Sequence, residues 1–506
     1  MILNTEISPE LNEWRVKIEQ WAKEYGLDFY ETIFEVLDWN QINMVAAYGG
    51  FPNRYPHWRW GMEYEQLSKS YAYGLSKIYE MVINNDPCYA YLLRGNKLVD
   101  QKMVIAHVFG HCDFFKNNIF FGPTYKNMMD QMSNHKTRLQ RYIDQIGYDR
   151  VETFVDTCLS IDNLIDYQMP FLKNKPIDAQ DEEDENEKKI EESRNVHKLR
   201  VDKHYLEEYI NPKAFLDLQK EKQEAEDKAD ANFPQQPELD IMGFLLEHAP
   251  LSRWEYDILH IVRREAYYFA PQAQTKIMNE GWASYWHSRI MTEKAVDPSE
   301  LIDFADHHSG TMAMSPQQIN PYKIGIELFR NIEERWNKGC FGKEYNDCED
   351  MVEKKKWDKQ LGLGQEKIFE VRRIYNDIMF LDEFLTADFC RENKFFAFTY
   401  NPLSNRYEIS DRDFPVIKQK LLTQLTNFGQ PIIAIVDANH NNRGELKLDH
   451  RHYGVDLDIQ YARETMQNLF KIWKRPVSIQ TKLNNNIKIY TYDGTEHKIL
   501  DSKEGL

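Results

Sequence analysis

The 506-residue sequence lacks any C-x-x-C pair. Its six cysteines are scattered along the chain, at Cys88, Cys112, Cys158, Cys340, Cys348 and Cys390. Such spacing does not fit a zinc site built from thiolates, and it does not indicate a disulfide framework. We therefore expect reduced thiols in a cytoplasmic protein.

Long apolar runs are also missing. The most apolar short run, Pro431 to Val436, is far too short to span a bilayer. Met1 to Glu10 contains no basic region followed by an apolar stretch, the pattern of a secretory signal. Both absences predict a cytoplasmic protein without membrane insertion.

Basic residues are outnumbered by acidic ones. Lys and Arg total 63 against 81 Asp and Glu, a formal net charge of −18. This balance argues against a partner that is a nucleic acid or an anionic membrane, because phosphate contacts need clustered Lys and Arg.

The sequence also has no G-x-x-x-x-G-K-[ST] motif and no G-x-G-x-x-G after a predicted strand, so nucleotide catalysis is not indicated. A serine or cysteine nucleophile has no elbow motif to support it.

What the sequence does contain is a large, mainly helical region with an interruption. Leu11, Trp14, Ile18 and Trp21 recur at helical spacing, and the pattern resumes over Tyr30 to Leu37. We predict a helical core in two parts, residues 1–173 and 240–393. Residues 174–239 separate them and include the run QDEEDENEKKIEESR. This composition is typical of a charged linker or of solvated helices.

The periodicity changes in residues 394–506, where strands and helices interleave. We predict strands at 395–400, 407–410, 431–436, 444–450, 477–483 and 487–492, and helices at 413–428 and 458–473. This order indicates a small α+β domain of ferredoxin-like type. The predicted fold class is therefore α+β, with a large helical N-terminal domain, a charged insertion and this C-terminal domain.

The first candidate site is a pair of histidines. His107 and His111 are four residues apart, so a helix places them one turn apart on the same face. Met103 and Phe114 share that face, so both imidazoles should point into an apolar interior. A metal ion would satisfy both side chains, and so would hydrogen bonds to carboxylates or to the backbone. Val108 occupies the position that holds Glu in the zinc-protease motif H-E-x-x-H.

The second candidate site is the segment NEGWASYWH at 279–287. Glu280 and His287 are seven residues apart, nearly two helical turns, and therefore share a face. The aromatic residues around them predict burial, and a buried carboxylate needs a cation, a metal ion or several hydrogen-bond donors. The N-E-G-x-A arrangement resembles the helix that supplies the glutamate ligand in zinc aminopeptidases of the gluzincin type. An ion pair with Arg263, Arg264 or Arg289 would satisfy Glu280 equally well.

A third candidate is Glu265, which shares a helical face with apolar residues of the segment 254–269. We predict that it acts as a general base or as a further ligand. A buried salt bridge is the alternative.

Several long strings in the sequence resemble one protein family. HVFGHCDFFKNN at 107–118, HIVRREAYYFAPQAQTKIMNEGWASYWH at 260–287 and INPYKIG at 319–325 resemble the stage V sporulation protein R family, as do FPNRYPHW at 51–58 and INNDPCYAYL at 83–92. The resemblance implies a bacterial, cytoplasmic protein linked to spore cortex formation or, in bacteria that make no spores, to cell-envelope physiology. It supplies no reaction and no catalytic residues.

Two functional hypotheses follow. In the first, the protein is a metal-dependent enzyme, a hydrolase in which His107, His111 and Glu280 hold zinc or another divalent ion. Glu265 would then be the base, and His287 the acid or transition-state stabiliser. In the second, it is a non-catalytic regulatory or scaffold protein that binds protein partners of the peptidoglycan machinery. The same buried polar residues would then only stabilise the helical core.

Overall fold

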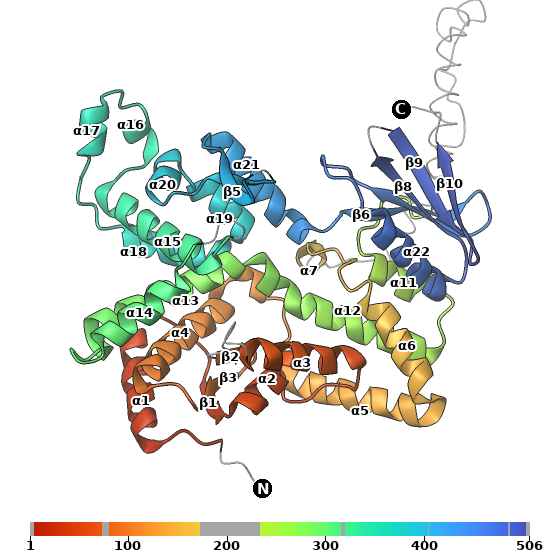
Figure 1. The fold of residues 1–506 in the computed structure, drawn as a ribbon, viewed down its shortest axis with the longest axis horizontal. Helices are drawn as coiled ribbons and strands as arrows, with labels where there is room; N and C mark the ends of the chain where they lie inside the picture. The colour runs from red at the N-terminus through yellow and green to blue at the C-terminus, as the bar shows by residue number, and fades with distance from the viewer. Residues whose placement is uncertain are drawn as a thin grey trace, which may run out of the picture. The chain divides into compact units, whose positions relative to one another are not determined.

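The computed structural model describes residues 5–72, 80–172, 233–314, 319–402, 404–483 and 486–501 (Figure 1). Contacts divide the chain into two compact units. The first comprises Met1–Glu152 and Tyr267–Gln430, and the second comprises Thr153–Ala266 and Pro431–Leu506. Residues 394–430 thus belong to the first unit. Most of the charged segment predicted at 174–239 lies outside the described residues.

The first unit begins with helices packed around a small sheet. Its elements are α1 (Pro9–Glu24), β1 (Thr32–Leu37), α2 (Trp39–Ala47), α3 (Trp58–Ala72), β2 (Glu80–Ile83), β3 (Cys88–Leu93), α4 (Leu98–Asn117), a 3-10 turn (Ile119–Phe121) and α5 (Met128–Ile146), followed by the start of α6 (Tyr148–Leu159). The sheet has the order β1-β3-β2, with β1 parallel and β2 antiparallel to β3.

The prediction of a helix over Tyr30 to Leu37 is wrong, because Thr32–Leu37 forms strand β1. Its side chains alternate, so that Phe34 and Val36 are buried while Ile33 and Glu35 are only partly buried. The backbone pairs with β3, 56 residues further along the chain. The apolar spacing at 30–37 fitted a helix, but the distant partner strand decided the structure.

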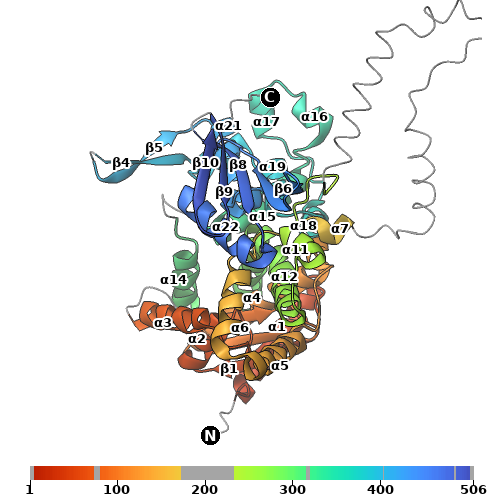
Figure 2. The same cartoon turned by 90° about the vertical axis from the view of Figure 1, so that its right-hand side faces the viewer.

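The later part of the first unit is helical. It consists of the end of α12 (Arg253–Gln274), then α13 (Lys276–Ile290), a π-helical turn (Met291–Ala295), α14 (Leu301–Thr311), α15 (Pro321–Lys338), α16 (Gly342–Asn346), α17 (Met351–Lys355), α18 (Gly364–Ile374), α19 (Asp377–Phe384), α20 (Ala387–Glu392), the hairpin β4 (Ala397–Asn401) and β5 (Arg406–Asp411), α21 (Phe414–Leu425) and a 3-10 turn (Thr426–Gly429). The β4–β5 hairpin extends outward from this unit (Figure 2). Helix α13 packs against both α4 and α15.

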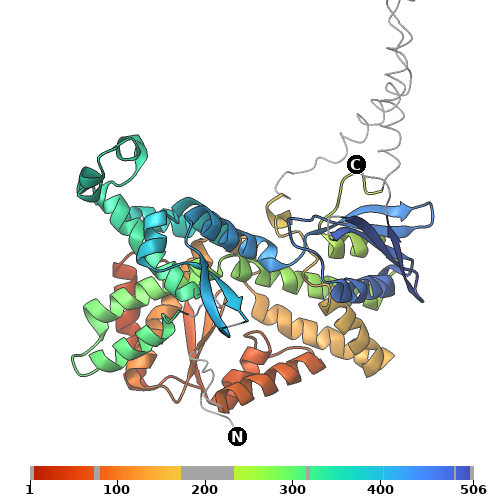
Figure 3. The same ribbon diagram turned by 45° about the horizontal axis from the view of Figure 1, so that its top comes forward.

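The second unit contains a five-stranded sheet with the order β10-β9-β8-β7-β6. Its elements are the rest of α6, α7 (Met169–Leu172), α11 (Ile241–His248), most of α12, β6 (Ile433–His440), β7 (Glu445–His450), α22 (Ile459–Trp473), β8 (Val477–Leu483), β9 (Asn486–Tyr492) and β10 (His497–Asp501). Helix α22 connects the parallel strands β7 and β8 and lies against the sheet (Figure 3). Since β7 and β8 are direct neighbours, no strand is inserted between them, unlike in the split βαβ unit of a ferredoxin-like sheet.

The α+β class is confirmed: a large helical region precedes a sheet domain with helices. Each strand and helix predicted over residues 394–492 is present near its predicted position. No described helix combines the length and the apolar composition that crossing a bilayer requires.

The first turn of α13 is held by a carboxylate from another helix. Thr275, at the N-cap, makes no side-chain capping bond. Instead, Asp377 of α19 accepts hydrogen bonds from the backbone N–H groups of Ile277 (2.8 Å) and Met278 (2.9 Å). A carboxylate at this end also interacts favourably with the helix dipole. Asp377 is only 2% exposed, and burial raises its pKa to about 7 against the opposing effect of the two N–H groups.

Replacing Asp377 with Asn should flatten the dependence of stability on pH. In the unfolded chain the pKa of Asp is about 3.9, so between that value and about 7 the folded state binds a proton that the unfolded state lacks. The contribution of Asp377 to stability therefore falls as pH rises through this window. From pH 5 to 7.5 the native chain should lose about 2 kcal/mol more unfolding free energy than the variant. Urea titrations at both pH values measure this difference, and equal losses would contradict it.

Candidate metal centre

Both candidate site helices are buried on almost every side. In α4 the buried residues run nearly without interruption from Val99 to Phe115, and α13 is similarly enclosed. His107 and His111 lie one turn apart on α4 and are only 5% and 7% exposed. Neither side chain can exchange its protein contacts for water, so each ring nitrogen needs a partner inside the protein.

Small residues allow these helices to approach closely. A Cβ atom on Gly110 would lie 2.6 Å from the Cα atom of Ala283 on α13. One on Gly281 would lie 2.4 Å from the Cα atom of Gly325 on α15. Gly110 lies between the two histidines in sequence, and Gly281 directly follows Glu280. Close contact at these points therefore places the Glu280 carboxylate beside the imidazoles.

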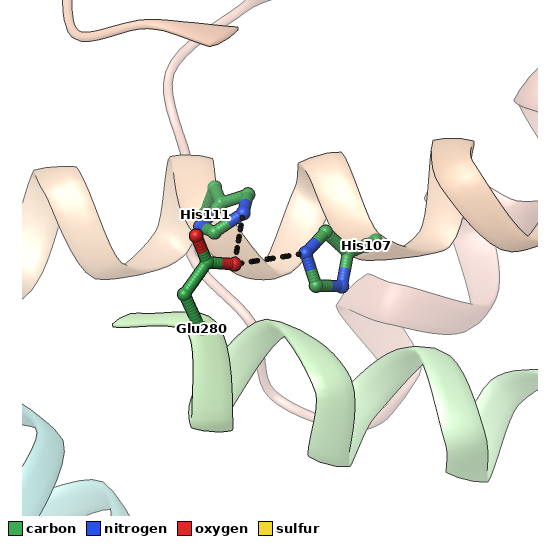
Figure 4. A group of neighbouring side chains, drawn as sticks. All are labelled: His107, His111 and Glu280. Atoms are coloured by element: carbon green, nitrogen blue, oxygen red, sulfur yellow. Dashed lines mark ion pairs between the residues drawn. The ribbon is translucent and has the colours of Figure 1, made fainter. Parts of the chain in front are cut away.

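His107, His111 and Glu280 form a compact group (Figure 4). The Oε2 atom of Glu280 lies 3.4 Å from Nε2 of His107 and 3.5 Å from Nε2 of His111. One donor atom from each residue falls within 4.8 Å of the other two. The two imidazole planes are nearly perpendicular, with ring centroids 4.5 Å apart. Three metal-ligand atoms from two helices thus converge on one point.

The other ring nitrogen of each histidine is also engaged. Nδ1 of His111 lies 2.9 Å from Oδ1 of Asn279. Nδ1 of His107 lies 2.9 Å from Nδ1 of His287, whose Nε2 lies 3.2 Å from Nδ1 of His308 on α14. Both Nε2 atoms are thereby left to face Glu280. Histidines that ligate metals commonly hydrogen-bond through the second nitrogen in this way.

Two further side chains border the group. Oε1 of Glu80 on β2 lies 4.0 Å from Nε2 of His107. The ring of Tyr322, at the start of α15, stacks on His107 with centroids 6.1 Å apart. Burial, and then the charges of Glu280 and Glu80, raise the pKa of Tyr322. Its hydroxyl therefore stays protonated next to the carboxylates.

The ionisable groups affect one another. Burial lowers the pKa of His107, but the close contact with the Glu280 carboxylate and the charges of Glu80 and Glu280 outweigh the effect of burial, so the net shift is upward. Burial and the neighbouring His107 lower the pKa of His111 to about 4. Burial raises the pKa of Glu280, but the histidines lower it further than burial raises it. Burial and the charge of Glu280 raise the pKa of Glu80, and the charge of His107 offsets this rise only in part.

His111 and Glu280 meet in an electrostatically unfavourable contact. With its pKa near 4, His111 is neutral at physiological pH. With the His111 proton on Nδ1, which faces the Asn279 oxygen, a lone pair on Nε2 faces a carboxylate oxygen. That oxygen, Glu280 Oε2, is buried and has no hydrogen-bond partner among the described residues. In that tautomer two electron-rich atoms face each other in a buried site, and a cation between them would relieve the repulsion.

Comparison with known proteins identifies the family. The family model described as "SpoVR like protein" matches residues 6–430, and the model described as "SpoVR-like C-terminal domain" matches residues 431–484. The chain belongs to the SpoVR-like family. A relative from Escherichia coli (strain K12), named "Uncharacterized protein YcgB", is 28% identical over 497 residues, which cover 93% of this chain and 91% of the relative. No solved structure matches.

The resemblance seen in the sequence is thereby confirmed, and both family models leave the reaction open. Of the predicted site residues, the structure brings together His107, His111 and Glu280, with His287 in contact through His107. Glu265 is buried on α12 in the second unit and is not part of the group. Its role as base stays a prediction, as does metal binding.

Sequence patterns missed Glu80 and Tyr322 as neighbours of the group. Each lies far from the histidines in the chain, and neither belongs to a motif with metal-ligand spacing. Asn279 was visible in the N-E-G segment, but only the structure gives it a partner, His111. His308 on α14 is half-buried and contacts His287.

Proposed function

We propose that the protein is a metal-dependent enzyme, a hydrolase, whose centre holds zinc or a similar divalent ion on His107, His111 and Glu280. The spacing of the donor atoms supports this most strongly. Tetrahedral ligands at about 2.1 Å from an ion lie about 3.4 Å from one another. The two Nε2-to-Oε2 distances are 3.4 and 3.5 Å. Two histidines and one carboxylate are also a donor set found in catalytic zinc sites, which leave one position open.

Such an ion would lower the pKa of a bound water and polarise a substrate oxygen. Among the chain's own residues, Glu80 is placed to accept a proton, because burial and Glu280 raise its pKa toward the range useful for a base. Tyr322, which keeps its proton, can donate a hydrogen bond to an oxygen that gains charge. The family name supports a link to sporulation. We place the activity in spore cortex or cell-envelope physiology, with protein partners of that machinery.

Metal analysis of the full-length protein tests this function. After chelator treatment and exposure to Zn²⁺, the protein should retain about one zinc per chain, as expected for a single site of three protein ligands. The double variant His107→Ala/His111→Ala should retain almost none. A matched control is His450→Ala/His452→Ala, a histidine pair of the second unit with ring centroids 6.0 Å apart, which should retain the zinc. Equal zinc content in all three proteins would contradict the proposal.

A chromosomal Glu280→Gln allele tests the cellular part. If the centre is catalytic, cells carrying a folded Glu280→Gln protein should show the same cortex or envelope defect as a deletion. A scaffold role predicts instead that this allele behaves as the native gene whenever the protein is present at native levels.

A further inference from the structure

A row of three imidazoles leads away from the His/His/Glu group. His107 on α4 contacts His287 on α13 through their Nδ1 atoms at 2.9 Å, and His287 contacts His308 on α14 through Nε2 and Nδ1 at 3.2 Å. The perpendicular rings of His287 and His308 have centroids 5.4 Å apart. His287 is 4% exposed, so its partners within the protein decide its hydrogen bonding.

A neutral imidazole carries one proton on two nitrogens. When all three imidazoles are neutral, each nitrogen-to-nitrogen contact needs one proton between the two atoms, so the row can run in only two directions. In one direction His107 donates from Nδ1 to His287, and His287 donates from Nε2 to His308. His107 Nε2 then presents a lone pair to the point faced by Glu280 Oε2. In the other direction that Nε2 carries the proton.

The two directions correspond to two states of the site. Without a cation, a proton on His107 Nε2 can point toward the Glu280 carboxylate. With a cation, the proton must lie on Nδ1, where Nδ1 of His287 lies 2.9 Å away to accept it; the backbone of Ala283 is a second hydrogen-bond partner of the His107 ring. Asn279 plays the same part for His111, because its Oδ1 atom accepts from Nδ1 and leaves Nε2 free.

We propose that His287 and Asn279 are positioning residues of the metal centre, which accept the Nδ1 protons of His107 and His111 and so direct both Nε2 lone pairs at one ion. His308 in turn accepts from His287 and holds it in the accepting tautomer. This inference rests on the proposed function and deepens it. In this proposal His287 accepts a hydrogen bond from His107 and so acts on the metal centre through that residue. The sequence had suggested instead that His287 is an acid.

The test compares two substitutions of one residue in the full-length protein. His287→Leu removes the acceptor, whereas the amide oxygen of His287→Gln retains one. Zinc affinity is measured by competition with a chromophoric chelator. His287→Leu should weaken affinity by about 10- to 100-fold, the usual effect of losing such a partner, and His287→Gln should recover most of it. Asn279→Leu should weaken affinity to a similar extent. His450→Leu, a buried histidine of the second unit, is the matched control and should bind as tightly as the native chain.

A second readout separates positioning from general stability. The visible spectrum of bound Co²⁺ reports ligand geometry, so His287→Leu should alter it at saturating metal while His287→Gln should resemble the native protein. If His287→Leu fails to fold, His308→Leu replaces it and should also weaken zinc binding. Equal affinities and spectra for the native, Leu and Gln proteins would overturn the positioning role alone. A native protein that binds neither Zn²⁺ nor Co²⁺ would overturn the proposed function as well.

Discussion

Glu280→Gln should lower zinc affinity by at least about 100-fold, since even losing a residue that only orients a ligand costs up to that much. The substitution removes the negative charge from the Oε2 atom, which lies 3.4 and 3.5 Å from the two imidazole Nε2 atoms. It nearly preserves shape, so the packing of α13 against α4 and α15 should be retained. Competition with a chelator measures the affinity, and elemental analysis measures the zinc retained.

The same variant should fold with a stability close to that of the native apoprotein, because the amide loses the attraction of His107 for the carboxylate but gains a donor toward His111. A neutral amide can donate to the lone pair on His111 Nε2, whereas the carboxylate leaves its Oε2 atom without a hydrogen-bond partner among the described residues. Glu334→Gln is the matched control, because this exposed carboxylate pairs with Lys338 on the same helix, away from the site. It should leave zinc affinity unchanged and stability within about 0.5 kcal/mol. Native zinc binding by a folded Glu280→Gln protein would remove Glu280 from the ligand set.

Gly281→Ala should destabilise the first unit by about 3 kcal/mol, at the upper end of what overpacking commonly costs. The added Cβ atom would lie 2.4 Å from the Cα atom of Gly325 and 2.5 Å from its carbonyl carbon. Both are backbone atoms of α15, so no side-chain rotation relieves the clash. Helix α13 must move instead, and zinc affinity should fall with stability because Glu280 is the adjacent residue. Urea titration and chelator competition measure the two effects.

Gly61→Ala provides the control for this substitution. Gly61 lies within α3, and a Cβ atom there would meet no atom within 4 Å. Alanine favours a helix by up to about 1 kcal/mol over glycine, so this variant should be slightly more stable with native zinc affinity. A Gly281→Ala protein as stable as Gly61→Ala would show that α13 and α15 are not tightly packed at this point.

Local sequence patterns determined much of what was predicted correctly. The four-residue spacing of His107 and His111 predicted that both lie on one buried face of a helix, which is α4. The two-residue period typical of strands predicted Val477–Leu483 with correct bounds. These features depend on neighbours a few residues apart, so the chain carries them within short windows. Strand β1 was missed because its partner β3 lies far away in the chain.

The sequence by itself determined the α+β class, the family resemblance and two helices rich in candidate ligands. Only the tertiary structure decided which side chains meet. It placed Glu280 beside the two histidines, added Glu80 and Tyr322, and put Glu265 in the second unit. The physical reason is that these meetings depend on contacts between distant small residues, such as Gly110 with Ala283 and Gly281 with Gly325. No local periodicity encodes which small residue will face which.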